Sequence, residues 1–216
     1  MINLKILKYA QIADVQKCTT LNEKTIVSDM MLRRRLTRNA RIALYLADQI
    51  GAEQNAVVIG NGYGEVSETY DILRAIYEKS SLSPTAFQNS VHNTPASYLS
   101  IVEQNRGYIT TVSDLQDTAS SVLKVGAIKS LQYPQLALMV TDSINFDQIA
   151  EINHCGIEFL EGGAALLVTR TSEEATITLR GKSYPKYSRT LWPMLEIIEQ
   201  CESLPAGCGA IISIAV

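Results

Sequence analysis

Short apolar runs alternate with segments of helical spacing through the middle of this chain, and this alternation limits the folds open to it. Residues 56–59 and 136–141 are apolar runs of strand length, and residues 108–112 have the same strand character. Segments with helical spacing lie between them, over residues 66–79 and 117–131. Strands that alternate with helices in this way predict a layered α/β fold.

The two ends of the chain extend this pattern. Residues 2–7 resemble a strand, and residues 36–50 predict an amphipathic helix that stops at Gly51. Its apolar face consists of Leu36, Ala40, Ala43, Leu44, Ala47 and Ile50. Pro193 suits the first turn of a last helix that ends near Glu202, and residues 209–216 predict a buried final strand.

Helix orientation and sheet type follow from the same spacing. In the helix over 66–79, the inward face consists of Val66, Tyr70, Leu73 and Tyr77. The helix over 117–131 is apolar nearly all round, so we expect it in the middle of the fold. Residues 156–160 and 164–170 flank Gly162 and Gly163, which predicts a hairpin, and residues 175–179 continue the strand character. The sheet is therefore expected to be mixed.

Composition bounds the class of protein. With 216 residues, 46% of them hydrophobic, the chain can bury the core of a single domain over residues 1–216. The net charge of -3 predicts no general attraction to nucleic acid. Every apolar run is far shorter than the roughly 18 residues of a membrane span, and Lys5 and Lys8 interrupt the N-terminus, so we expect a cytoplasmic protein. No CxxC pair is present, so reduced thiols are expected at Cys18, Cys155, Cys201 and Cys208, with no metal or other cofactor.

Three patterns that can carry chemistry have a structural interpretation that we prefer. The glycines of residues 60–64 follow a strand and precede a helix, but their spacing is GxGxG and not the GxGxxG of a dinucleotide loop. His92 lies between two expected helices, where an imidazole more often satisfies backbone groups than catalyses. A basic cluster predicts a solvated helix face, with an acidic partner or phosphate as the alternative; it consists of Arg33, Arg34, Arg35, Arg38 and Arg41.

Residues 83–101, SPTAFQNSVHNTPASYLSI, resemble the segment that precedes the nucleophile in β-ketoacyl synthases. The form SVHN is closest to short ketosynthase-like proteins classed as chain-length factors. Residues 156–169, GIEFLEGGAALLVT, are similar to a second family segment, and residues 57–77 match the short subgroup. The resemblance covers most of the chain and implies a thiolase-like layered α/β fold, the N-terminal half only, with a mixed sheet and a buried central helix.

The resemblance also has departures. Ser97 replaces the usual glycine, and Thr141 and Asp142 replace a Gly-Gly pair. The two catalytic histidines of the family belong to a second half of the fold, for which this sequence offers no counterpart. The absence of these histidines is expected to remove catalysis.

Gln116 takes the place of the nucleophile in this resemblance. Without a gap after Ile101, the Thr-Ala-Cys turn of the family falls on residues 114–116. A condensing cysteine sits where a strand turns into the central helix, because the helix N-terminus lowers the thiol pKa and its amides can bind an oxyanion. A glutamine cannot form a thiolate, so no catalytic residue is expected; the alternative is that Gln116 simply caps a buried helix start.

The resemblance implies a non-catalytic chain-length factor that forms a heterodimer with a full-length β-ketoacyl synthase in fatty-acid-like, polyene or polyketide biosynthesis. An acyl carrier protein stays open as a second partner. The dimer strand would be residues 108–112, with Tyr108, Thr110 and Val112, where Thr110 is expected to supply a ladder donor. Residues 87–93, with Phe87, His92 and Asn93, would approach the acyl tunnel of the partner.

Two other functions remain as alternatives. One is a free-standing enzyme such as a malonyl-thioester decarboxylase, in which Gln116 polarises the carbonyl group; the small number of histidines counts against it. The other is a nucleotide-binding module built on residues 60–64, and the broken glycine spacing counts against that. For Phe87, the alternative to a tunnel wall is a side chain that packs in the core beneath its loop.

Overall fold

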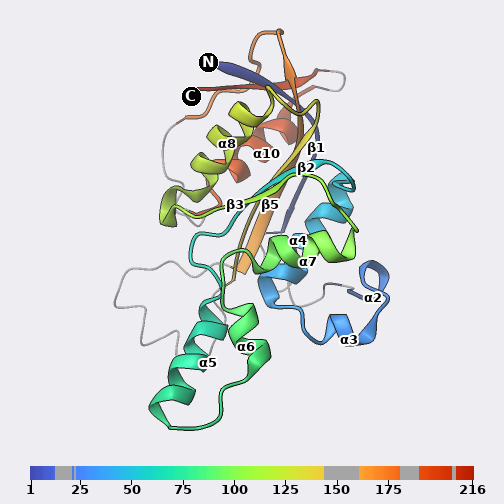
Figure 1. The fold of residues 1–216 in the computed structure, drawn as a ribbon. Coiled ribbons are helices and arrows are strands. Elements are labelled where there is room, and N and C mark those ends of the chain that lie inside the picture. The colour runs from blue at the N-terminus through green and yellow to red at the C-terminus, as the bar shows by residue number, and fades with distance from the viewer. Residues whose placement is uncertain (13–20, 22, 144–160, 181–189, 206–207) are drawn as a thin grey trace.

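The computed structural model describes residues 1–12, 21, 23–143, 161–180, 190–205 and 208–216. Its strands form one mixed sheet in the order β3-β2-β4-β5-β1-β6 (Figure 1). The first three strands of this order are parallel to one another, and each later neighbour is antiparallel. The strands are β1 (Ile2–Ile12), β2 (Ala56–Gly60), β3 (Ile109–Val112), β4 (Leu136–Ser143), β5 (Glu161–Thr171) and β6 (Ala210–Ile214).

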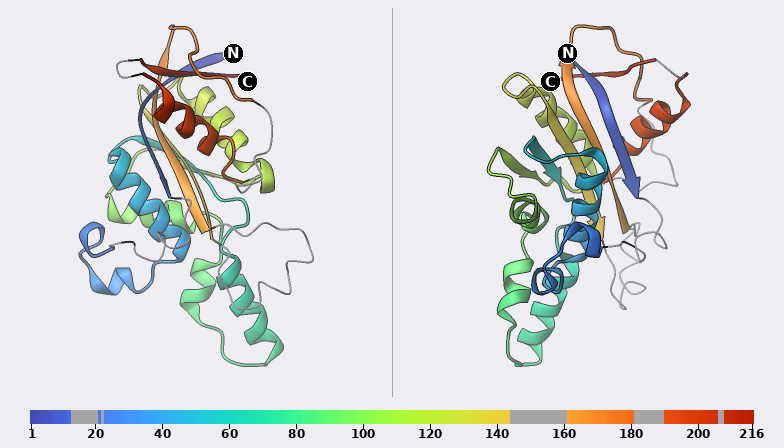
Figure 2. Two further views of the ribbon diagram at one scale, coloured as in Figure 1. Left: turned by 180° about the vertical axis from the view of Figure 1, so that it is seen from behind. Right: turned by 90° about the vertical axis from the view of Figure 1, so that its right-hand side faces the viewer.

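Helices cover both faces of the sheet, so the fold has three layers (Figure 2). One apolar core joins α8 and α10 to one face, and a second core joins α4 and α7 to the other. The layered α/β prediction is confirmed. The helices are α2 (Glu23–Ile26), α3 (Met30–Arg33), α4 (Arg38–Ile50), α5 (Val66–Tyr77), α6 (Pro84–Asn89), α7 (Thr94–Val102), α8 (Thr118–Lys129) and α10 (Met194–Ser203), with a 3-10 turn η1 (Leu115–Asp117) before α8.

Helix α4 forms as its sequence predicts. Thr37 caps its start, because the Thr37 hydroxyl accepts a hydrogen bond from the backbone N–H of Ala40 at 3.1 Å. Gly51 ends it with φ of 66°, in the left-handed region that favours glycine. All six residues of the predicted apolar face are buried.

Helix α8 lies in the middle of the fold, also as predicted. It packs against β2 and β4, which are buried along their whole lengths. The approach is close at Gly60, where an added Cβ would lie 2.6 Å from Cγ2 of both Thr118 and Val122. A glycine at the end of β2 therefore lets the helix rest directly on the sheet.

The inward face predicted for residues 66–79 is wrong. Helix α5 forms, but none of its residues is buried, and Leu73 and Tyr77 are 61% and 89% exposed. The physical reason is that α5 does not lie on the sheet. It packs against α6 and projects with it beyond the end of the sheet (Figure 1). We call residues 66–89, which contain α5 and α6, the arm.

The predicted hairpin at Gly162 and Gly163 is also wrong, because both residues lie inside β5 and pair with β4. Gly163 is required there by close packing: an added Cβ would lie 2.7 Å from the Val140 carbonyl oxygen and 2.8 Å from Leu46 Cδ1 of α4. Residues 156–160 lie outside the described residues. In the predicted strand over 175–179, Ile177 forms a single bridge to Ile212.

Candidate functional site

Polar residues gather where the three parallel strands end, at one edge of the sheet. The loop 61–65 follows β2, the turn 113–118 follows β3, and Thr141, Asp142 and Ser143 end β4. The carboxyl ends of parallel strands meet at a common edge, which is where open α/β sheets bind their ligands. We call these three segments the strand-end site.

Gln116 lies in the 3-10 turn that joins β3 to α8, and its side chain is exposed. Thr118 holds this turn: its hydroxyl accepts from the Asp114 N–H at 3.0 Å and donates to the Leu115 carbonyl at 2.7 Å. Leu115 has φ of 43°, a backbone conformation that is rare for residues other than glycine. The N-cap residue of α8 is Asp117, and the alternative that Gln116 caps a buried helix start stays open.

The glycine loop over residues 60–64 packs between two neighbours. On one side, an added Cβ at Gly62 would lie 2.7 Å from the Leu115 carbonyl oxygen, so the loop touches the Gln116 turn. On the other side, Gly64, with φ of 72°, lies against the ring of His92. The loop therefore separates His92 from the turn that carries Gln116.

The backbone amides of this loop already have partners within the chain. Asp142 accepts hydrogen bonds from the N–H groups of Gly62 at 3.3 Å and Tyr63 at 3.1 Å. The side chain of Asn61 accepts from the N–H of Gly64 at 2.7 Å. A phosphate-binding loop points such amides at its ligand, so this geometry argues against the nucleotide-binding alternative.

Two carboxyl groups beside the loop are buried. Burial raises the pKa of Asp142 to about 6, although hydrogen bonds from Thr190 and the loop amides act in the opposite direction. Burial also raises the pKa of Glu65 to about 7, against hydrogen bonds from Thr37 and Asn39. Both groups therefore change protonation state closer to neutral pH than an ordinary carboxyl group does.

The predicted solvated arginine face is wrong for three of its five members. Arg38 forms a salt bridge with the buried Glu161, which also accepts a hydrogen bond from Ser143 at 3.2 Å. Arg33 donates to the carbonyls of residues 27 and 28, and Arg41 donates to those of residues 33 and 36. These side chains serve internal contacts, and the exposed members are Arg34 and Arg35.

The structure places Phe87, His92 and Asn93 on the surface around α6 and the start of α7. Phe87 is 70% exposed, so the alternative that it packs in the core is wrong. Asn93 borders a hollow of about 480 Å³ between α7 and β3, which Ser97, Ile101 and Thr111 also line. The segment 87–93 is therefore accessible to another chain.

Thr110 and Val112 belong to β3, the strand at one edge of the described sheet, and Tyr108 directly precedes it. The Tyr108 ring stacks on Tyr133 with 5.2 Å between ring centroids, at the end of the strand remote from Gln116. The amide of Val57 in β2 donates to the Tyr108 carbonyl, and the amide of Asn61, directly after β2, donates to the Val112 carbonyl. Because a parallel ladder alternates, Thr110 also faces β2, and Thr111 directs its N–H and C=O outward. The Thr110 amide is therefore a ladder donor toward β2 and not toward a partner strand.

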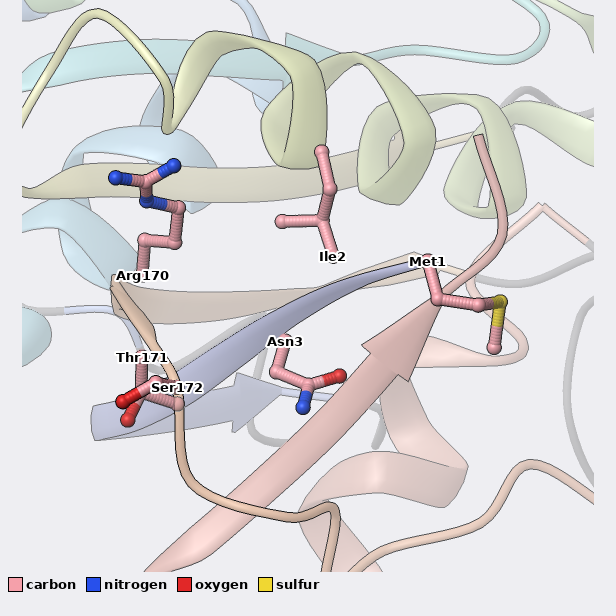
Figure 3. A pocket seen from close by; sticks show the side chains of 6 residues that line it. All are labelled: Met1, Ile2, Asn3, Arg170, Thr171 and Ser172. Carbon is pink, nitrogen blue, oxygen red and sulfur yellow. The ribbon is translucent and has the colours of Figure 1, made fainter.

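A second hollow, of about 620 Å³, lies at the far end of β5 (Figure 3). Along β5 it is about 30 Å from Glu161, at roughly 3.4 Å per residue. Figure 3 shows Arg170 and Asn3 on opposite sides of the strands that carry them, so their polar groups do not converge. We therefore place no function in this hollow.

The described residues contain no group of three or more His, Cys, Asp or Glu side chains that could hold a metal ion. In the same part of the chain, no helix is long and apolar enough to cross a membrane.

Of the four cysteines, Cys18 and Cys155 lie outside the described residues. Burial raises the pKa of Cys201 to about 11, which makes it a poor nucleophile, and Cys208 is exposed.

Sequence reasoning placed Gln116 at the turn but gave no role to Glu65, Asp142 or Glu161. A signal was available for Asp142, since a carboxylate directly after an apolar strand lies where parallel strands end. Glu161 gave no such signal, because its partner Arg38 is 123 positions away in the chain. Such a pair requires the three-dimensional fold.

Comparison with known proteins agrees with this geometry. A family model described as "Beta-ketoacyl synthase, N-terminal domain" matches residues 11–189. Among curated proteins, none matches the sequence significantly. Two solved structures are similar in fold. A chain of the ketosynthase ApeO in complex with its chain length factor ApeC, from Xenorhabdus doucetiae, has a TM-score of 0.65 and 20% identity, over 87% of this chain and 88% of that chain. A chain of the ishigamide ketosynthase/chain length factor has a TM-score of 0.64 and 14% identity, over 81% of this chain and 63% of that chain.

Proposed function

The chain belongs to the family of β-ketoacyl synthase N-terminal domains, and on this basis we propose that it is a non-catalytic, chain-length-factor-like subunit. In this proposal it pairs with an active β-ketoacyl synthase and shapes the acyl tunnel of that enzyme. The pathway would be of the polyketide, polyene or fatty-acid type and would operate in the cytoplasm. An acyl carrier protein is a further candidate partner of the assembled pair.

One observation carries the proposal: Gln116 occupies the turn from β3 into the central helix. Carbon–carbon bond formation through an acyl-enzyme needs a nucleophile that can hold the acyl group, which a thiolate does and a carboxamide does not. The turn keeps the geometry that would activate a cysteine, at the N-terminus of α8. The chain therefore offers the shape of a condensing site without its reactive atom.

The edge strand β3 supports the pairing. In the described sheet, one side of β3 pairs with β2, and the outward N–H and C=O of residues 109 and 111 face the other side. An exposed edge of this kind favours pairing with another strand. The hollow between α7 and β3 lies directly beside it and gives room for a partner to approach.

The similar solved structures are compatible with this arrangement. The ApeO–ApeC structure is matched over nearly equal shares of the two chains, so the matched chain has about the same length as this one. Its title names a ketosynthase together with a chain length factor. We therefore expect this chain to assemble with a ketosynthase in the same manner.

Co-expression with a full-length β-ketoacyl synthase that carries its cysteine and two histidines tests the proposal. We expect the two chains to co-purify as a heterodimer in size-exclusion chromatography. Thr111→Pro should abolish this co-purification, because proline removes the outward donor of the edge strand. Thr111→Ala keeps the donor and is the matched control. If the proline variant binds as the wild type does, the interface lies elsewhere, and condensation by the isolated chain would refute the proposed function itself.

A further inference from the structure

The arm is joined to the rest of the molecule by buried polar side chains at its two ends. At the first end, Glu65 directly precedes α5, and its carboxyl group accepts hydrogen bonds from the Thr37 hydroxyl at 2.7 Å and the Asn39 amide at 3.4 Å. The same Asn39 amide donates to the carbonyl oxygen of Gly64 at 3.2 Å. The start of the arm is thus tied to the start of α4.

The second end of the arm is tied to the same segment. Asn89, the last residue of α6, donates its amide to the Arg35 carbonyl at 2.9 Å. The Tyr98 hydroxyl lies 2.9 Å from that carbonyl oxygen and 3.0 Å from Asn89 Oδ1. Residues 35–39 therefore hold both ends of the arm through side-chain hydrogen bonds.

Between these two ends the arm has little apolar anchorage. Helix α5 has no buried residue, and its main packing partner is α6 of the same arm. In α6 the buried residue is Asn89, which belongs to the anchor itself. A segment with few buried apolar contacts opens locally at low cost, without unfolding the core. The polar anchors therefore decide how tightly the arm is held.

The surroundings of Glu65 favour its neutral form. Burial raises the Glu65 pKa most, and the carboxyl groups of Glu68 and Asp142 raise it further. The hydrogen bonds from Thr37 and Asn39 lower this pKa but do not reverse the shift. Arg38, which lies between Thr37 and Asn39 in the sequence, is already paired with Glu161. Two other groups lie near the anchor: His92, whose ring packs on Gly64, and Arg35, whose carbonyl belongs to the second anchor. A charged Glu65 thus stands in a buried site beside two further acids.

The neutral carboxyl also fits the hydrogen bonding of this cluster. Asn39 Oδ1 is buried and has no hydrogen-bond partner among the described residues. A carboxylate can only accept, whereas a neutral carboxyl group supplies an O–H donor. Protonated Glu65 therefore supplies a hydrogen-bond donor, which the buried acceptor Asn39 Oδ1 lacks.

We infer that Glu65 is a proton-controlled latch, which holds the arm against residues 35–39 when its carboxyl group is neutral and releases the arm when that group ionises. The sign follows from the shift in pKa from 4.5 to about 7. The stabilisation is fully present below about pH 4.5 and is lost as the pH rises through about 7. Between pH 6 and pH 8, the opening equilibrium of the arm should increase roughly tenfold. The latch is a property of this chain alone and does not depend on the proposed pairing.

Hydrogen–deuterium exchange of the arm amides in the isolated full chain tests the latch, after correction for the intrinsic effect of pH on exchange. In the wild type we expect the tenfold increase in opening. Glu65→Gln, which imitates the neutral carboxyl group, should remove the increase and keep the arm protected at pH 8. Glu78→Gln, an exposed acid just after α5, is the matched control and should behave as the wild type.

Asn89→Ala provides a second, independent variant. It removes the other anchor, so the arm should open more at every pH while the slope with pH is retained. If Glu65→Gln follows the wild-type pH profile, the latch is refuted. The same conclusion follows if the Asn89→Ala variant loses its pH dependence, because the slope would then not originate at Glu65.

Discussion

The sheet and the arm of this molecule are held by different forces. In the sheet, β2 and β4 are buried along their whole lengths, and glycines bring α4 and α8 into direct contact with the strands. In the arm, α5 buries none of its residues, and side-chain hydrogen bonds at the two ends of the arm hold it against residues 35–39. Close packing therefore fixes the strand-end site, and polar contacts fix the part that carries Phe87.

The largest effect that separates the two regions is expected at Gly60. In Gly60→Ala the new methyl group would lie 2.6 Å from Cγ2 of Thr118 and of Val122. Both neighbours are branched at Cβ and have little rotamer freedom within a helix, so they cannot move aside cheaply. We expect the free energy of unfolding to fall by about 3 kcal/mol, as measured by chemical denaturation.

Gly209→Ala is the control for this substitution. An added Cβ there lies 3.5 Å from Lys5 Cε, which is an ordinary contact. Its effect on the free energy of unfolding should stay within about 0.5 kcal/mol. Equal effects at the two glycines would contradict the view that α8 is fixed by close packing on β2.

This contrast also explains what the sequence can predict. The spacing of apolar residues identified α4 and the inward face that its residues share, because that face meets the sheet. The same spacing identified α5 as a helix but assigned it an inward face, and Leu73 and Tyr77 are exposed. Periodicity reports that one side of a helix is apolar, and it does not report what that side contacts.

Two further errors have the same origin in tertiary context. A Gly-Gly pair usually marks a turn, but Gly163 lies within β5 because the Val140 carbonyl and Leu46 approach it closely. Which amides of β3 face outward depends on its register with β2, and no local pattern encodes that register. In contrast, the resemblance predicted a strand-to-helix turn at Gln116, and the structure has this turn between β3 and α8.

Removing the Phe87 side chain is expected to affect the function of the arm and not the stability of the protein. Because Phe87 is 70% exposed, Phe87→Ala should change the free energy of unfolding by no more than about 0.5 kcal/mol. If the proposed pairing is correct, Phe87 narrows the acyl tunnel of the partner by excluded volume, and the substitution should shift the products of the heterodimer toward longer chains. Product lengths are measured by mass spectrometry of the complex with its synthase.

Tyr77→Ala is the matched control for Phe87. Tyr77 is also an exposed aromatic residue of the arm, at 89%, but it lies on α5, outside residues 87–93. Its removal should leave the product lengths unchanged. If both variants lengthen the products, the arm acts as a whole and Phe87 has no special place in it; if neither does, residues 87–93 do not form the tunnel wall.

The smallest effect on stability is expected at Gln116, which takes the place of the nucleophile in the proposed function. Gln116→Cys replaces an exposed side chain, so the melting temperature should be unchanged within error. The new thiol lies at the N-terminus of α8, where the helix dipole favours the thiolate, so iodoacetamide should modify it faster than the exposed Cys208.

Condensation by the Gln116→Cys variant should still be absent, because it also needs acid–base groups, and the glycine loop separates His92 from this turn. Incubation with acyl and malonyl thioesters, followed by mass spectrometry, distinguishes a reactive thiol from a working enzyme: an acyl adduct without condensed product agrees with the proposal, and turnover by this variant alone would show that the chain retains the remaining catalytic groups.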